Sequence, residues 1–114
     1  MSKLIGRFYF KRTENGNLIG EYSHNTSKFI ASECSEPIGI TNGFLGTYNS
    51  TWIHGKSAII SELIITKSER SCKIFKLEWK YSDAKHFWGE GFVVDGILIG
   101  DYRDFVLEEP TVGK

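Results

Sequence analysis

Aromatic side chains are the residues of this chain best suited to bind a small molecule. The sequence holds three tryptophans, five tyrosines and eight phenylalanines. Large rings supply apolar contact area, and tyrosine and tryptophan add a polar group that can orient a ligand. The six rings that we predict to bind ligand are Tyr22, Tyr48, Trp52, Trp79, Trp88 and Tyr102. In the alternative interpretation these rings simply fill the interior of a small β domain, which is often packed solid.

No group of polar residues indicates catalysis, and we predict no catalytic residue. Nucleophilic catalysis needs a serine or cysteine held against a histidine, and the chain has no Gly-x-Ser-x-Gly motif. Glu90 lies between Gly89 and Gly91 and is flanked by Trp88 and Phe92. Among inward-facing rings its pKa would rise, as a general acid requires. If the glycine face packs inward, Glu90 is exposed, and we favour this non-enzymatic interpretation.

The histidines do not indicate a metal site. His24, His54 and His86 are far apart and have no Cys or His at ligand spacing, whereas zinc needs three or four convergent ligands. We therefore predict neither a metal nor a cofactor.

Length and charge limit the class of protein. A chain of 114 residues predicts one domain, which we place at residues 1–106, followed by a flexible tail at 107–114. Fourteen basic and fourteen acidic residues give zero formal charge, which argues against nucleic-acid and anionic-membrane partners.

The N-terminus shows neither a signal peptide nor an apolar run long enough for a membrane helix. Cys34 and Cys72 are interpreted as two reduced thiols, with a single disulfide as the alternative. Together these features predict a cytoplasmic protein.

A repeated phrase predicts how the chain folds. Residues 95–102 read Asp-Gly-Ile-Leu-Ile-Gly-Asp-Tyr, residues 15–22 read Asn-Gly-Asn-Leu-Ile-Gly-Glu-Tyr, and 42–48 form a shorter copy. Each copy begins with Asn-Gly or Asp-Gly, which favours a type I′ hairpin turn because both residues can adopt positive φ. Each phrase therefore predicts a turn followed by a returning strand.

Alternation of apolar and polar residues predicts seven or eight strands. The seven that we expect lie at about 4–12, 18–24, 43–53, 58–66, 74–81, 86–94 and 97–105. The isoleucine-rich strand at 58–66 is expected to be covered on both faces.

Residues 25–42 are ambiguous. The sequence permits either a short helix over 28–34 or a short strand at 29–31, and a connection of this length often serves as a lid or an end plug.

The architecture that follows is an all-β, antiparallel up-and-down meander of seven to eight strands, closed or nearly closed into a small barrel. Closure removes the exposed edges of the sheet, and glycines within strands provide the bends that it needs. A two-sheet sandwich is the alternative.

The phrase at 16–22 and the segment Gly46-Thr47-Tyr48-Asn49-Ser50-Thr51-Trp52 resemble hairpins of the avidin and lipocalin-like (calycin) barrels. That resemblance implies eight strands and a ligand inside one end.

Apolar residues also occupy the faces opposite the expected core, namely Tyr9, Ile19, Leu45, Ile53, Ile60, Ile64, Ile74 and Ile99. A contiguous apolar patch marks an interface, so we expect a homodimer or a higher homo-oligomer.

The function that the sequence favours is binding of a small apolar or aromatic ligand in the interior. The alternative is a non-enzymatic interaction or structural module that acts through the surface of the oligomer.

Overall fold

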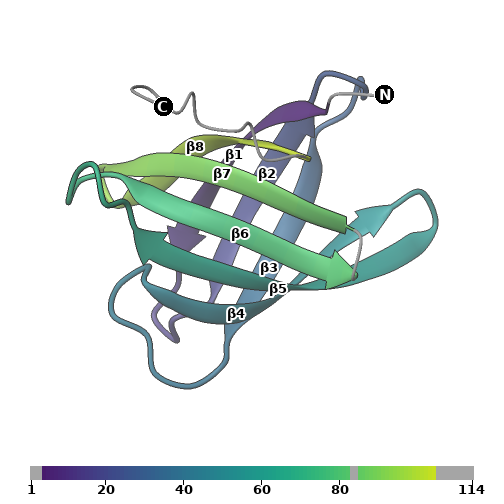
Figure 1. The fold of residues 1–114 in the computed structure, drawn as a ribbon. Coiled ribbons are helices and arrows are strands. Elements are labelled where there is room, and N and C mark those ends of the chain that lie inside the picture. Colours follow the sequence, from purple (N-terminus) through teal and green to yellow (C-terminus); the bar gives the residue numbers. More distant parts are fainter. Residues whose placement is uncertain (1–3, 83–84, 105–114) are drawn as a thin grey trace.

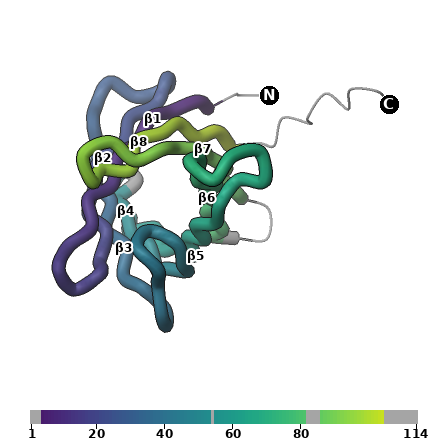
Figure 2. Tube along the Cα trace, turned by 90° about the vertical axis from the view of Figure 1, so that its left-hand side faces the viewer, coloured from purple at the N-terminus to yellow at the C-terminus, as the bar shows by residue number. Residues whose placement is uncertain are grey.

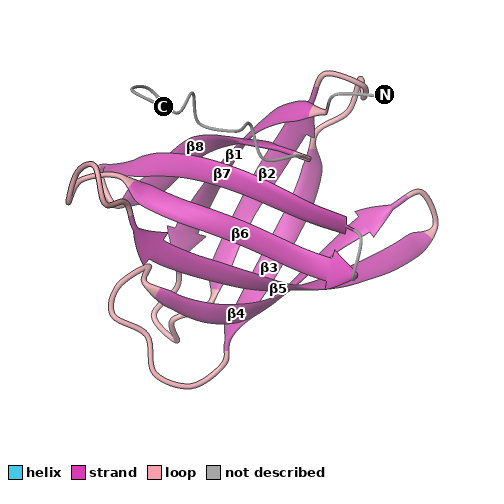
Figure 3. Cartoon of the chain, viewed as in Figure 1, coloured by secondary structure: helices cyan, strands magenta, loops and turns pink. Residues whose placement is uncertain are grey.

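The computed structural model describes residues 4–82 and 85–104, and these form eight strands and no helix (Figures 1 and 3). No described segment is thus a helix of the length and apolarity needed to cross a membrane. The strands are β1 (Ile5–Arg12), β2 (Leu18–His24), β3 (Ala31–Pro37), β4 (Gly46–His54), β5 (Ser57–Lys67), β6 (Phe75–Ser82), β7 (Lys85–Val94) and β8 (Ile97–Arg103).

The strands form one closed antiparallel barrel. Each strand pairs with the next along the chain, and β8 pairs back on β1, with Phe8 opposite Gly100 and Tyr9 opposite Ile99. Figure 2 shows the strands arranged around a complete ring. The predicted up-and-down barrel is confirmed, and the sandwich alternative is wrong. The tail predicted at 107–114 lies outside the described residues.

The repeated phrases form turns, but of more than one kind. Asp95 and Gly96 have φ values of 51° and 78°, as the predicted type I′ turn requires. At the first copy only Gly16 has positive φ, and the N–H of Thr13 donates to the carbonyl of Asn17 at 2.8 Å. The prediction of a type I′ turn there is wrong, because a longer loop with a single left-handed glycine joins β1 to β2.

The ambiguous segment supplies the eighth strand. The predicted helix over 28–34 does not form, and the strand of this segment, β3, lies at 31–37 instead of the predicted 29–31. Phe29 and Ile30 lie in the preceding loop and are exposed. Within β3, Glu33 and Ser35 face inward and are buried. Pairing with both β2 and β4 stabilises a strand that its own polar sequence does not indicate.

The strand β5 is covered on one face only. Ser61, Leu63 and Ile65 point into the barrel and are buried, whereas Ile60 is 65% exposed on the outer face. The expectation of cover on both faces is therefore wrong. A closed barrel has a single interior, so alternate residues of every strand face outward.

One half of the interior is filled with side chains. At the end that carries the β1–β2, β3–β4, β5–β6 and β7–β8 connections, the buried residues are Phe10, Leu18, Phe44, Tyr48, Leu63, Ile65, Leu77 and Leu98. Phe44 comes from the loop between β3 and β4, and its carbonyl accepts a hydrogen bond of 2.9 Å from the hydroxyl of Tyr48. This end of the barrel is closed.

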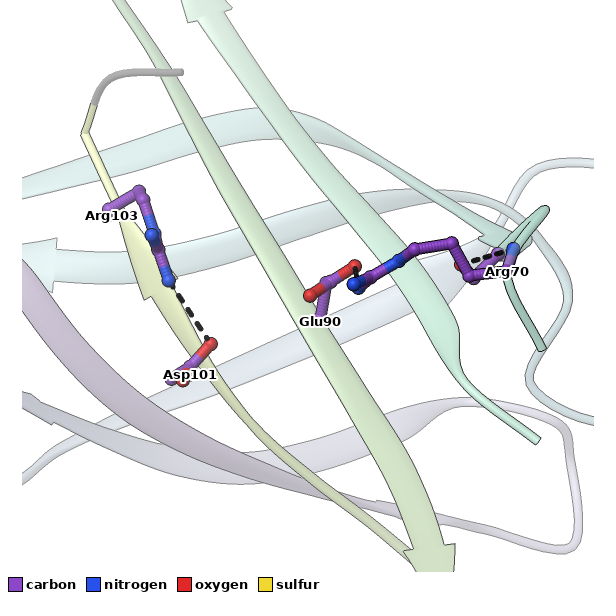
Figure 4. A network of polar contacts seen from close by, with 5 residues as sticks. Arg70, Glu90, Asp101 and Arg103 are labelled. Carbon is purple, nitrogen blue, oxygen red and sulfur yellow. Dashed lines mark hydrogen bonds and ion pairs between the residues drawn. The ribbon is translucent and has the colours of Figure 1, made fainter. Parts of the chain in front are cut away.

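The outer surface carries ordinary polar groups. Glu90 is exposed and pairs with Arg70 at 2.6 Å, and Asp101 pairs with Arg103 at 3.7 Å (Figure 4). Exposed pairs of this kind contribute little to stability. Gly91 is buried beside Glu90, which confirms that the glycine face is the inward one.

Cys34 and Cys72 are both free and exposed, which contradicts the disulfide alternative.

Candidate functional site

The other half of the barrel is hollow. A cavity of about 460 Å³ opens at the end where β1, β3, β5 and β7 begin and β2, β4, β6 and β8 end. Its lining residues are Leu4, Phe8, Tyr22, His24, Thr26, Glu33, Trp52, Ile59, Trp79, Tyr81, His86, Phe87, Tyr102 and Asp104. They come from all eight strands and from the ends of the chain segments beside them, so the cavity exists only in the closed barrel.

Four of the six predicted ligand-binding rings line this cavity, namely Tyr22, Trp52, Trp79 and Tyr102. Tyr48 does not, because it is buried in the filled half. Trp88 does not either: it alternates in β7 with the cavity residue Phe87 and lies opposite Glu78 and Arg103 in the register. The barrel thus distributes the six predicted rings over three environments: four line the cavity, Tyr48 lies in the filled half, and Trp88 lies outside both.

Four rings in the hollow half touch in a closed loop, which we call the aromatic quartet: Tyr22, Trp52, Phe87 and Tyr102. Their centroids are 6.5 Å apart for Tyr22 and Trp52, 6.2 Å for Trp52 and Phe87, 5.9 Å for Phe87 and Tyr102, and 6.2 Å for Tyr102 and Tyr22. All four contacts are edge-to-face, with interplanar angles of 72–85°. Such contacts fix the orientation of each ring.

A buried carboxylate lies next to the quartet. Glu33 is 5% exposed and is the register partner of Trp52. Its Oε2 accepts a hydrogen bond of 2.8 Å from Nε1 of Trp79 and a second from the hydroxyl of Ser50. The Ser50 hydroxyl also lies 2.7 Å from that of Ser35. This polar row crosses β3 and β4 on the inner face.

Glu33 is the residue that sequence reasoning missed. Residues 32–36 read Ser-Glu-Cys-Ser-Glu, so both faces of β3 carry polar side chains and neither stands out as inward. Only the pairing with β2 and β4 determines which face is buried. The neighbouring strand β4 has an inward face that includes Ser50 and Trp52. Because Glu33 is the register partner of Trp52, that face indicates that Glu33 also points inward once the pairing is known.

Burial dominates the electrostatics of the site. It raises the pKa of Glu33 to about 7, although the hydrogen bonds from Ser50 and Trp79 act in the opposite direction. Burial, followed by the negative charge of Glu33, raises the pKa of Tyr22 to about 12. The pKa of Tyr102 also rises, first through burial and then through Tyr22 and Glu33. Both phenols therefore stay protonated, while Glu33 titrates near neutral pH.

Polar residues line the mouth of the cavity. Nδ1 of His24 accepts a hydrogen bond of 3.2 Å from the N–H of Thr26, so a neutral His24 carries its proton on Nε2. Asp104 accepts a hydrogen bond of 3.2 Å from the N–H of Leu4. The described residues contain no cluster of three or more potential metal ligands.

Comparisons of the chain with protein-family models, with curated proteins and with solved structures found no match. The class of protein is therefore defined by geometry alone. It is an eight-stranded antiparallel barrel, compatible with the calycin fold, with one closed end and one end that opens into an aromatic cavity.

Proposed function

We propose that this protein binds a small apolar or aromatic ligand in the hollow half of its barrel. The observation that supports this proposal most strongly is the division of the interior. Buried side chains occupy one end, while the other end holds a cavity of about 460 Å³ walled by aromatic rings. The calycin-like resemblance of the hairpin phrases is in accord with a ligand at one end of the barrel.

The cavity has the properties of a small-molecule site. Such sites measure about 300–1,000 Å³ and combine apolar walls with a few polar groups. Here the walls are mainly rings, and Glu33 is the buried charged group among them. Edge-to-face contacts hold the quartet in place before a ligand arrives, which lowers the entropy lost on binding.

Two neighbouring residues of β5 provide a matched test. Ile59 lines the cavity, whereas Ile60 faces outward and is exposed. Ile59→Trp places a large ring in the cavity, and Ile60→Trp places the same ring in solvent. We expect the uncharged fluorescent probe N-phenyl-1-naphthylamine to bind the wild type and Ile60→Trp alike, and to bind Ile59→Trp about tenfold or more weakly because the cavity is occupied.

Titration of the probe fluorescence measures this difference, and circular dichroism verifies that both variants are folded. Equal affinity for all three proteins would place the probe outside the barrel and would contradict the proposal.

A second candidate function is association through the outer face of β7, β8 and β1. Phe92 is the register partner of Ile99, which is in turn the partner of Tyr9. Phe92 and Ile99 are 53% and 40% exposed, and neighbouring Val94 is also exposed. An apolar patch that continues across three strands supports the proposal of a homodimer or higher homo-oligomer.

We also propose a cytoplasmic location. The support is that Cys34 and Cys72 are free and exposed, a state that reducing compartments maintain.

A further inference from the structure

We propose that the cavity selects an organic cation, an amine or a quaternary ammonium group on an apolar body, and pairs it with Glu33 beside the aromatic quartet. This inference rests on the proposed function and names the class of ligand that the same cavity takes. Three features support it, namely the uncompensated carboxylate, the arrangement of the four rings, and the charges around the mouth.

The carboxylate has no cationic partner in the described part of the chain. The ion pairs found there join Arg70 to Glu90, Lys80 to Glu78 and Arg103 to Asp101. Both hydrogen bonds to Glu33 come from neutral donors and both end on Oε2.

Among the described residues, no hydrogen bond reaches Oε1 of Glu33. Burial makes the ionised form of a carboxylate costly, and a bound ammonium group would compensate its charge.

The quartet suits the same cation. Its four centroid separations lie between 5.9 and 6.5 Å. A point in the middle of the loop is therefore within about 6 Å of every ring centroid, and a cation that meets the face of a ring at that distance is attracted to it. Glu33 is the register partner of Trp52, and its negative charge acts on Tyr22 and Tyr102, so the carboxylate lies beside this loop. A cation between the rings is thus close to the negative charge.

No lysine or arginine lines the cavity in the part of the chain that the structure describes. The titratable groups that share the cavity with Glu33 are Tyr22, His24, Tyr81, His86, Tyr102 and Asp104. They include no lysine or arginine, and Asp104 adds a second acid. An anionic ligand would meet two carboxylates, whereas a cation is attracted by both.

The alternative is a neutral ligand that accepts a hydrogen bond from protonated Glu33. The two ligand classes predict opposite responses to pH. A cation binds more tightly as pH rises through the range in which Glu33 ionises, and its binding below that range releases the Glu33 proton. A neutral acceptor binds more tightly as pH falls and releases none.

The experiment compares phenethylamine with 2-phenylethanol by isothermal titration calorimetry. The two probes have the same apolar body and differ in an ammonium in place of a hydroxyl. At about pH 8 we expect phenethylamine to bind the wild type at least about tenfold more tightly. At about pH 5.5, titrations in two buffers of different ionisation enthalpy should show release of a proton on binding.

Glu33→Gln keeps the shape of the side chain and removes its charge, so the preference for phenethylamine should disappear. Glu36→Gln is the matched control, because Glu36 lies on the same strand but faces outward and is exposed. It should retain the preference. Binding of N-phenyl-1-naphthylamine to both variants verifies that the cavity is intact, and the two wild-type titrations test the proposal even if Glu33→Gln does not fold.

Equal affinities for the two probes, or an undiminished preference in Glu33→Gln, would overturn the assignment of a cation. If N-phenyl-1-naphthylamine still binds in that case, the proposed function stands and only the ligand class is wrong. If neither this probe nor the phenethyl pair binds the wild type, both proposals fail.

Discussion

A single buried glutamate makes the stability of this barrel depend on pH. Glu33 has an ordinary pKa of 4.5 and a pKa of about 7 in the folded protein. Between these values the unfolded chain binds fewer protons than the folded one, so the free energy of unfolding decreases as pH rises. The contribution is fully present below about pH 4.5 and is lost above about pH 7.

We expect the wild type to lose about 3 kcal/mol of stability across this range, because each pKa unit corresponds to about 1.4 kcal/mol. In Glu33→Gln this decrease should be absent, since the amide does not titrate. Urea unfolding at about pH 5 and about pH 8 measures the difference. If Glu33→Gln shows the same decrease as the wild type, other groups cause it and the burial of an ionisable Glu33 is not responsible.

At the scale of elements, glycines within strands allow neighbouring strands to approach closely. A Cβ added at Gly20 in β2 would lie 1.8 Å from the carbonyl oxygen of Tyr9, and one at Gly100 in β8 would lie 2.0 Å from that of Glu90. The neighbouring backbone leaves no room for a side chain at either position. These are two of the strand glycines from which the sequence predicted closure.

Gly20→Ala should therefore destabilise the protein by about 3 kcal/mol, because the strands β1 and β2 must move apart. Ile19→Ala is the control, since Ile19 is adjacent and exposed and should lose less than about 1 kcal/mol. Thermal and urea denaturation measure both values. A Gly20→Ala variant as stable as Ile19→Ala would show that the close approach of the two strands is not required.

The strands also show which parts of the fold can be predicted from the sequence and which cannot. Strands with alternating apolar residues, such as the one predicted at 74–81, were predicted correctly because one face of each is visibly apolar. The strand β3 was not, because Glu33 and Ser35 face a barrel interior and leave no apolar face to detect. The most distinctive polar residue of the site lies on the one strand that local pattern could not reveal.

At the scale of the whole molecule, the outer face of β7, β8 and β1 is the basis for the proposed oligomer. Ile99 lies at its centre, between Phe92 and Tyr9 in the register. We expect Ile99→Arg to dissociate the oligomer without unfolding the protein, because the new charge would be buried at the interface. Light scattering measures the mass and circular dichroism the fold. A folded Ile99→Arg variant that stays oligomeric would exclude this face as the interface.

Whole-molecule closure also explains which site residues the sequence could predict. Six aromatic residues were predicted to bind ligand, and four of them, Tyr22, Trp52, Trp79 and Tyr102, do line the cavity. The sequence could not show which half of the barrel interior is packed with side chains and which half holds a cavity. Tyr48 belongs to the same predicted set but lies in the filled half, a position set by strand length and register around the complete ring.

The three tryptophans allow the most direct test of the central claim that the hollow half binds ligand. Trp52 and Trp79 line the cavity, whereas Trp88 does not. In a nitrogen–proton correlation spectrum each indole N–H gives its own signal. On addition of N-phenyl-1-naphthylamine we expect the signals of Trp52 and Trp79 to shift and that of Trp88 to stay in place. A shift confined to Trp88, or no shift at saturating probe, would contradict binding inside the barrel.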